Sequence, residues 1–150
     1  MRKAVRSCMM SADKTKVYRI LDANLNRARE GIRVAEDVAR LYLNNQSLSK
    51  KFKSLRHRIT KIAQESFEAD RLLFFRDSVA DVGAKGMGKM EGKRKGLAGV
   101  VQANLRRAQE ALRVLEEMGK LVKKDSAEKF KRVRFRIYTL EKEMGQKTEI

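Results

Sequence analysis

The sequence contains no proline and no tryptophan, and only one cysteine and one histidine among its 150 residues. The lone Cys8 excludes an internal disulfide and a zinc site built from cysteines, and the lone His57 excludes a histidine cluster. No apolar run approaches the length of a membrane span, and no apolar signal core follows Met1. We therefore expect a soluble, cytoplasmic protein with no membrane partner.

Charge is abundant, and one sign dominates it. The chain has 36 Lys and Arg against 19 Asp and Glu, which gives a formal net charge of +17. Such a surface suits nucleic acid, small phosphorylated substrates, or solvent with no polyanionic partner. No groove-reading motif is visible, and the three Tyr and six Phe fall mostly in apolar seams rather than in a stacking platform. A basic nucleic-acid-binding protein remains the alternative function, but nucleic acid is not the expected partner.

The residues that are abundant favour long helices, since Ala, Leu, Lys, Arg and Glu lose little free energy on entering a helix. Apolar residues recur at steps of three and four along four segments, as on one face of an amphipathic helix. The four predicted helices cover about residues 13–43, 47–75, 97–122 and 125–148. Asp13, Ser47 and Asp125 are the expected N-caps.

Two segments of the sequence are repeated. Residues 23–37 read ANLNRAREGIRVAED, and residues 103–117 read ANLRRAQEALRVLEE. Further along, FKSLRHRI at residues 52–59 is matched by FKRVRFRI at residues 130–137. Each half of the chain is therefore a long helix, a short turn and a second long helix.

The repeat predicts the architecture. We expect an all-α protein with one domain over residues 1–150, a four-helix bundle of two repeated helical hairpins. The hairpins span about residues 17–75 and 97–148. They are joined by a glycine-rich crossover loop at about residues 77–96.

The repeat also keeps polar residues that packing does not need. Asn24 and Asn104 fall within an arc that is otherwise apolar, and Arg27 and Arg107 fall at its edge. An Asn in such an arc costs free energy unless its amide is satisfied. In one interpretation the Asn fixes helix register, and the small residues four positions after each Arg permit close helix crossing. In the other interpretation, a polar cavity separates the repeats, where Asn forms hydrogen bonds with a ligand and Arg binds the phosphate of that ligand.

Repeated carboxylates follow Arg33 and Arg113, and they allow two interpretations. They form an ordinary salt-bridged surface, or they hold Mg²⁺ with phosphates supplying the remaining oxygens. Acidic residues at the start of the crossover loop are further metal candidates. The metal candidates are Asp77, Asp81, Glu36 and Glu117.

The crossover loop contains GAKGMGK at residues 83–89, which fits the phosphate-cradling spacing G-x-x-x-x-G-K. Met90 stands where Ser or Thr should ligate Mg²⁺, and no strand precedes the motif, so a true P-loop is not expected. A basic lid that closes over phosphates is the remaining interpretation. His57 lies opposite an apolar seam, and its counterpart is Phe135, so it is either a structural or exposed residue or one that touches substrate.

Four segments carry a family resemblance. They are DANLNRAREGIRVAED at residues 22–37, LRH at 55–57, RDSVADVG at 76–83 and NLRRAQEALRVLEE at 104–117. In this order they resemble the small monofunctional hydroxymethylpyrimidine-phosphate kinases of thiamine biosynthesis, a domain that also occurs fused in front of thiamine-phosphate synthase. The resemblance covers about residues 18–143.

The resemblance implies ATP-dependent phosphorylation of 4-amino-5-hydroxymethyl-2-methylpyrimidine phosphate to the diphosphate, with Mg²⁺. It also implies that the product passes to a thiamine-phosphate synthase. The expected site comprises Arg27, Arg107 and Arg76 as catalytic residues, Asn24, Asn104, Arg33, Arg113, His57 and Gly83 as substrate-binding residues, and the four metal candidates. A homodimer and a catalytically silent helical scaffold stay open as alternatives.

Overall fold

The computed structural model describes the backbone of residues 2–86 and 92–147, with side chains from residue 13 onward. Within these residues every regular element is helical, which confirms the predicted all-α class. The elements are α1 (Arg2–Asp37), the π-helical turn η1 (Val38–Tyr42), α2 (Gln46–Ser66), α3 (Ala69–Phe74), α4 (Gly96–Gly119) and α5 (Asp125–Lys147). No described helix combines the length and the apolarity that crossing a membrane requires.

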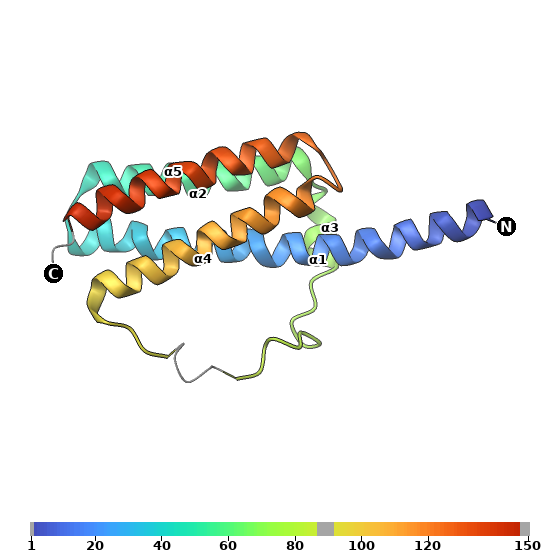
Figure 1. Cartoon of the computed structure of the whole chain (residues 1–150), viewed down its shortest axis with the longest axis horizontal. Coiled ribbons are helices and arrows are strands. Elements are labelled where there is room, and N and C mark those ends of the chain that lie inside the picture. The colour runs from blue at the N-terminus through green and yellow to red at the C-terminus, as the bar shows by residue number, and fades with distance from the viewer. Residues whose placement is uncertain (1, 87–91, 148–150) are drawn as a thin grey trace.

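The four long helices form two antiparallel hairpins, α1 with α2 and α4 with α5 (Figure 1). Helix α1 packs most extensively on α4, and α2 packs on α5, so the hairpins face each other through two layers. In Figure 1 the described parts of the crossover between α3 and α4, residues 75–86 and 92–95, lie beneath α1 and α4, away from α2 and α5. The predicted four-helix bundle of two hairpins with a long crossover is confirmed.

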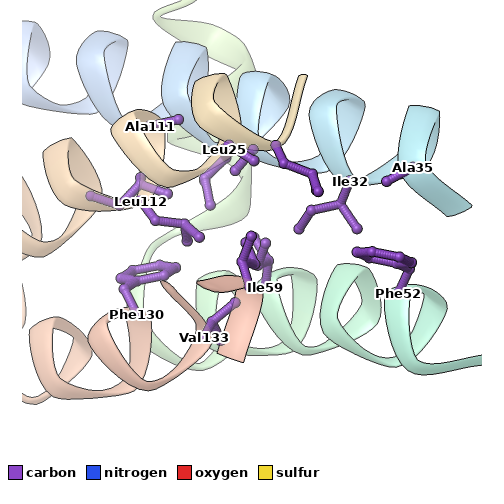
Figure 2. Close-up of a cluster of buried hydrophobic side chains, with 14 of the residues drawn as sticks. Leu25, Ile32, Ala35, Phe52, Ile59, Ala111, Leu112, Phe130 and Val133 are labelled. Atoms are coloured by element: carbon purple, nitrogen blue, oxygen red, sulfur yellow. The ribbon is translucent and has the colours of Figure 1, made fainter. Parts of the chain in front are cut away.

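The core consists of the apolar stripes that the periodicity predicted. On α1 and η1 the predicted stripe is buried along its whole length, from Leu21 to Ala39. Figure 2 shows the rings of Phe52 and Phe130, at equivalent positions of the two hairpins, on either side of Ile59. Each such fully buried side chain stabilises the fold by about 1.5–3 kcal/mol relative to an exposed one.

Two predicted N-caps were wrong. Asp13 lies inside α1, because no proline or glycine between residues 2 and 12 stops the helix from extending toward the N-terminus. The cap of α2 is Asn45 rather than Ser47: its Oδ1 accepts a hydrogen bond from the Leu48 N–H at 3.0 Å. Asn44 before it adopts a φ of 50°, a conformation that Asn tolerates better than most residues.

The predicted continuous helix to residue 75 was also wrong. Helix α2 ends at Ser66, and Phe67 adopts an extended backbone with φ −128° and ψ 153°. This break places the buried Phe67 ring against Phe130, with ring centroids 6.1 Å apart. The next backbone N–H, of Glu68, donates to the hydroxyl of Tyr18 at 3.2 Å. The aromatic contacts between hairpins override the local helical pattern and turn the chain back toward α1.

Helices α1 and α4 cross closely at Gly31. A Cβ added there would overlap the carbonyl oxygen of Asn104 and lie 3.2 Å from the Cβ of Ala108. Glycine is required because the backbones approach too closely for any side chain. The small residue therefore permits close crossing, as in the first of the two interpretations, and does not leave room for a ligand at this point.

Candidate functional site

The structure brings the two repeated asparagines to the same helix interface. Asn24, only 5% exposed, donates from Nδ2 to the carbonyl oxygen of Ile20 at 2.9 Å. Asn104 donates in the same way to Val100 at 2.9 Å. One amide proton of each is thus satisfied within its own helix, which holds each side chain at the crossing of α1 and α4. Neither amide oxygen accepts a hydrogen bond from another described residue.

The two repeated arginines lie at the outer edge of this crossing. Arg27 and Arg107 are both exposed. Helices α1 and α4 are antiparallel, and Gly31 contacts Asn104 where they cross. Arg27 lies one turn before Gly31, and Arg107 lies one turn after Asn104. In an antiparallel pair these two offsets bring both arginines to the same level of the crossing. Among the described residues neither guanidinium has an ion pair. Two unpaired cations at one place are suited to bind an anion.

The opposite flank of α1, which faces α2, is built on a buried ion pair. Glu36 is 3% exposed and accepts from Arg56 Nε at 2.8 Å and Nη2 at 3.3 Å. The pair recurs in the second hairpin, where buried Glu116 accepts from Nε of Arg134 and from its Nη2 at 3.1 Å. Hydrogen bonding to the carboxylate raises the pKa of each of these arginines above its ordinary value.

Sequence reasoning missed these ion pairs. The signal was present, because Arg56 and Arg134 are identical residues in the second repeated segment, four positions after Phe52 and Phe130. Charged partners on different helices leave no spacing rule within one helix, so the pairing could not be found without the fold.

Two of the predicted metal ligands, Glu36 and Glu117, are neutralised by cations. Arg33 lies 3.7 Å from Glu36 in addition to the Arg56 pair. Glu117 contacts Arg113 at 3.1 Å and Lys120 at 3.0 Å. The hydrogen bond from Lys120 lowers the pKa of Glu117. Carboxylates in such pairs do not fit a magnesium site.

The other two metal candidates lie at the start of the crossover. Asp77 Oδ1 accepts from the Ala80 N–H at 3.0 Å, and Asp81 Oδ1 accepts from the Gly83 N–H at 2.9 Å. Both carboxylates are exposed. No three His, Cys, Asp or Glu residues in the described part of the chain are grouped to hold a metal ion. The metal-binding role of these residues therefore stays a prediction.

A further ion pair holds the start of the crossover against α1. Arg76 donates to buried Asp22 through Nε and Nη2, both at 2.7 Å, and Arg19 donates to the carbonyl oxygen of Asp77 at 2.8 Å. The carboxylate raises the pKa of Arg76. Asp22 was not predicted as a site residue, although it opens the first motif. The contact joins the first and third motifs of the family resemblance.

The predicted site residues thus divide between two flanks of α1. Asn24 and Arg27 face the α4 side, whereas Arg33 and Glu36 face the α2 side. His57 is exposed on α2. The phosphate-cradle spacing that starts at Gly83 continues through residues 87–91, which lie outside the described residues. The roles of all these residues in binding stay predictions.

Comparison with known proteins places the chain among relatives in one family. The sequence profile of the ThiD2 family matches residues 19–143. The chain is 43% identical over 125 residues to a thiamine-phosphate synthase of Nostoc punctiforme, which covers 83% of this chain and 34% of that protein. It is 42% identical over 133 residues to the protein of the same name in Synechocystis sp., covering 89% and 37%.

A relative of lower sequence identity carries the same name. The chain is 37% identical over 139 residues to a thiamine-phosphate synthase of Rhodopirellula baltica, covering 93% of this chain and 37% of that protein. The chain therefore spans roughly a third of the length of the curated relatives it matches. No solved structure matches it.

Proposed function

We propose, from the premise that the chain belongs to the ThiD2 family, that it acts in thiamine biosynthesis as a hydroxymethylpyrimidine-phosphate kinase. Two observations support this proposal. The relatives carry the name thiamine-phosphate synthase, and the chain matches about a third of their length. The four motifs quoted above resemble the small helical kinases of that pathway. The diphosphate product would pass to a thiamine-phosphate synthase.

The proposed reaction moves one phosphoryl group. An oxygen of the pyrimidine monophosphate bonds to the γ-phosphorus of ATP, the bond from that phosphorus to the β–γ bridging oxygen breaks, and ADP leaves with that oxygen. A phosphate monoester is already largely ionised near pH 7, so the acceptor needs no strong general base. Charge neutralisation and alignment of two anions are the main tasks of the protein. Arginines and amides can perform them without histidine.

The observation that carries the proposal is the matched pair of arginines at the crossing of α1 and α4. Arg27 and Arg107 would hold phosphate oxygens of the two reactants, because a planar guanidinium can donate two parallel hydrogen bonds to one phosphate. Asn24 and Asn104 would accept from the substrate or orient the arginines. The described parts of the crossover, residues 75–86 and 92–95, lie on the α1 and α4 side of the bundle in Figure 1 and would cover the bound anions.

We propose that Mg²⁺ enters with ATP. Magnesium is usually held by one or two carboxylates together with phosphate oxygens. Asp77 and Asp81 fit this role better than Glu36 and Glu117, since among the described residues neither Asp has an ion pair, whereas each Glu has one. When bound, the ion would neutralise charge on the phosphates.

The test is an ADP-release assay with purified protein, ATP, Mg²⁺ and the pyrimidine monophosphate. ADP formation that depends on the pyrimidine, together with the diphosphate by mass spectrometry, is the expected result. The absence of pyrimidine-dependent ADP would refute the kinase. A thermal shift with ATP and Mg²⁺ separates a silent scaffold, which would show none. RNA titration at two salt concentrations tests the alternative function, nucleic-acid binding, which the net charge of +17 favours.

A further inference from the structure

A basic hollow lies where the first hairpin turns, between the end of α1 and the start of α2. Its volume is about 410 Å³. Five cationic side chains and one carboxylate line it, together with three neutral polar residues. The lining residues are Arg33, Arg40, Lys50, Lys53, Arg56, Glu36, Asn44, Gln46 and Ser49.

The cations of the hollow are only partly neutralised. The buried Glu36 holds Arg56, and Arg33 pairs with Asp37 at 3.2 Å. The remaining three cations, Arg40, Lys50 and Lys53, are exposed and have no ion pair or hydrogen bond to another described residue. Like charges gathered in a concave surface raise the local positive potential and concentrate anions there.

The second hairpin provides an internal comparison, because the repeat places different residues at the same positions. Lys120 stands for Arg40 and pairs with Glu117 at 3.0 Å. Glu128 stands for Lys50 and contacts Arg132 at 3.6 Å. Lys131 stands for Lys53, and its Nζ lies 5.9 Å from the ring centroid of Phe135. The hairpin fold therefore does not need three unpaired cations at this turn.

We propose that the hollow of the first hairpin is a binding site for a polyphosphate chain, such as that of a nucleoside triphosphate or of pyrophosphate. Unpaired cations along the α2 wall and at η1 suit an extended anion with several charges better than one compact phosphate. The amides of Asn44 and Gln46 and the hydroxyl of Ser49 supply further donors. The site lies on the flank of α1 opposite Arg27, and it stands whether or not the proposed kinase activity is found.

Isothermal titration calorimetry with inorganic pyrophosphate tests the site. Lys53→Glu is compared with Lys131→Glu, which makes the same charge change at the equivalent position of the second hairpin. We expect Lys53→Glu to weaken pyrophosphate binding by at least about tenfold, and Lys131→Glu to change it by less than about twofold. Equal losses in the two variants, or no binding to the wild type, would overturn the proposal, since binding would then follow net charge alone.

Four additions complete the experiment. Circular dichroism confirms that both variants fold, and Lys50→Glu, which copies the residue of the second hairpin, must give the same loss as Lys53→Glu. Tripolyphosphate and ATP are both expected to compete with pyrophosphate. Tighter binding of ATP than of tripolyphosphate identifies a nucleotide as the ligand, and the reverse order identifies a free polyphosphate. If inorganic phosphate or the pyrimidine monophosphate binds as tightly as pyrophosphate, the site recognises a single phosphate and the proposal is wrong.

Discussion

The two hairpins share a skeleton and differ at one surface. Both bury the same apolar stripe, and both hold a buried glutamate on the first helix with an arginine of the second, Glu36 with Arg56 and Glu116 with Arg134. At the turn, the first hairpin exposes unpaired cations around a hollow, whereas the second has a paired lysine, a glutamate and a lysine near an aromatic ring at the equivalent positions. The residues that pack the core and form the buried ion pair are therefore alike in both halves, whereas the residues at the exposed turn differ.

Aromatic residues mark the same difference. In the second hairpin the hydroxyl of Tyr138 accepts from Arg134 at 2.9 Å, and the ring of Phe135 lies 5.2 Å from that guanidinium. The equivalent positions of the first hairpin hold Thr60 and His57, which leave Arg56 open to the hollow. The arginine of the buried ion pair thus lies beside aromatic rings in one half and lines the hollow in the other.

The largest effect is expected from breaking the shared ion pair. Glu36→Gln and Glu116→Gln each leave an arginine beside a neutral amide, and loss of one partner of a buried pair costs about 3–5 kcal/mol. Both variants should lower the free energy of unfolding in urea by similar amounts.

The matched controls are Glu30→Gln and Glu110→Gln, equivalent exposed positions in the two repeats, which should stay within about 0.5 kcal/mol of wild type. A large loss in only one of the two buried variants would show that the hairpins do not share this pair as an equal structural element.

A smaller effect is expected at the helix crossing, where the halves differ by one methyl group. Gly31→Ala should destabilise the fold by about 1–3 kcal/mol, because the added Cβ overlaps the backbone of α4 at Asn104. Gly145→Ala on α5 is the control, since nothing lies within 4 Å of its added Cβ. The control should raise stability by up to about 1 kcal/mol in thermal unfolding. Two stabilising substitutions would contradict the close crossing.

The arginine pair is tested by activity. Arg107→Lys should lower kcat/KM for the proposed kinase by at least about tenfold, equivalent to about 1.4 kcal/mol, with little change in Tm. Arg27→Lys should do the same if the repeats supply one anion site each. Arg106→Lys, a neighbouring exposed arginine, should leave kcat/KM within about twofold. Lost Tm with retained activity would make Arg107 structural and move the search to Arg76, Asp77 and Asp81.

The smallest effect concerns the carboxylate that neutralises the second turn. Lys120 holds the folded-state pKa of Glu117 below its ordinary value of 4.5, so this contact stabilises the fold above that pH. The contribution is lost as the pH falls through the lowered pKa. In Lys120→Gln, carboxyl NMR titration should show the pKa of Glu117 rising toward 4.5. An unchanged titration would mean that Lys120 does not neutralise this turn.

The repeat and the helical periodicity could be read without a structure. The stripe from Leu21 to Ala39 is buried as predicted, and Asn24 lies in its arc as predicted. The break at Phe67 could not be predicted, because local propensity favours helix there and the reason for the break is a ring on α5. The separation of Arg27 from Arg33 onto two flanks also needed the packing of α4 and α2.

The sequence by itself determined the all-helical fold, the two hairpins and the repeated polar residues, because these follow from residue spacing within single helices. Only the tertiary structure decided which charges meet. Glu36 had been compatible with a metal ion or a surface salt bridge, and Arg56, 20 residues away, neutralises it from another helix. The same packing decided that Arg40, Lys50 and Lys53 surround one hollow, whereas Lys120, the counterpart of Arg40, pairs with Glu117. Contacts between helices depend on register and crossing distance, which no spacing within one helix contains.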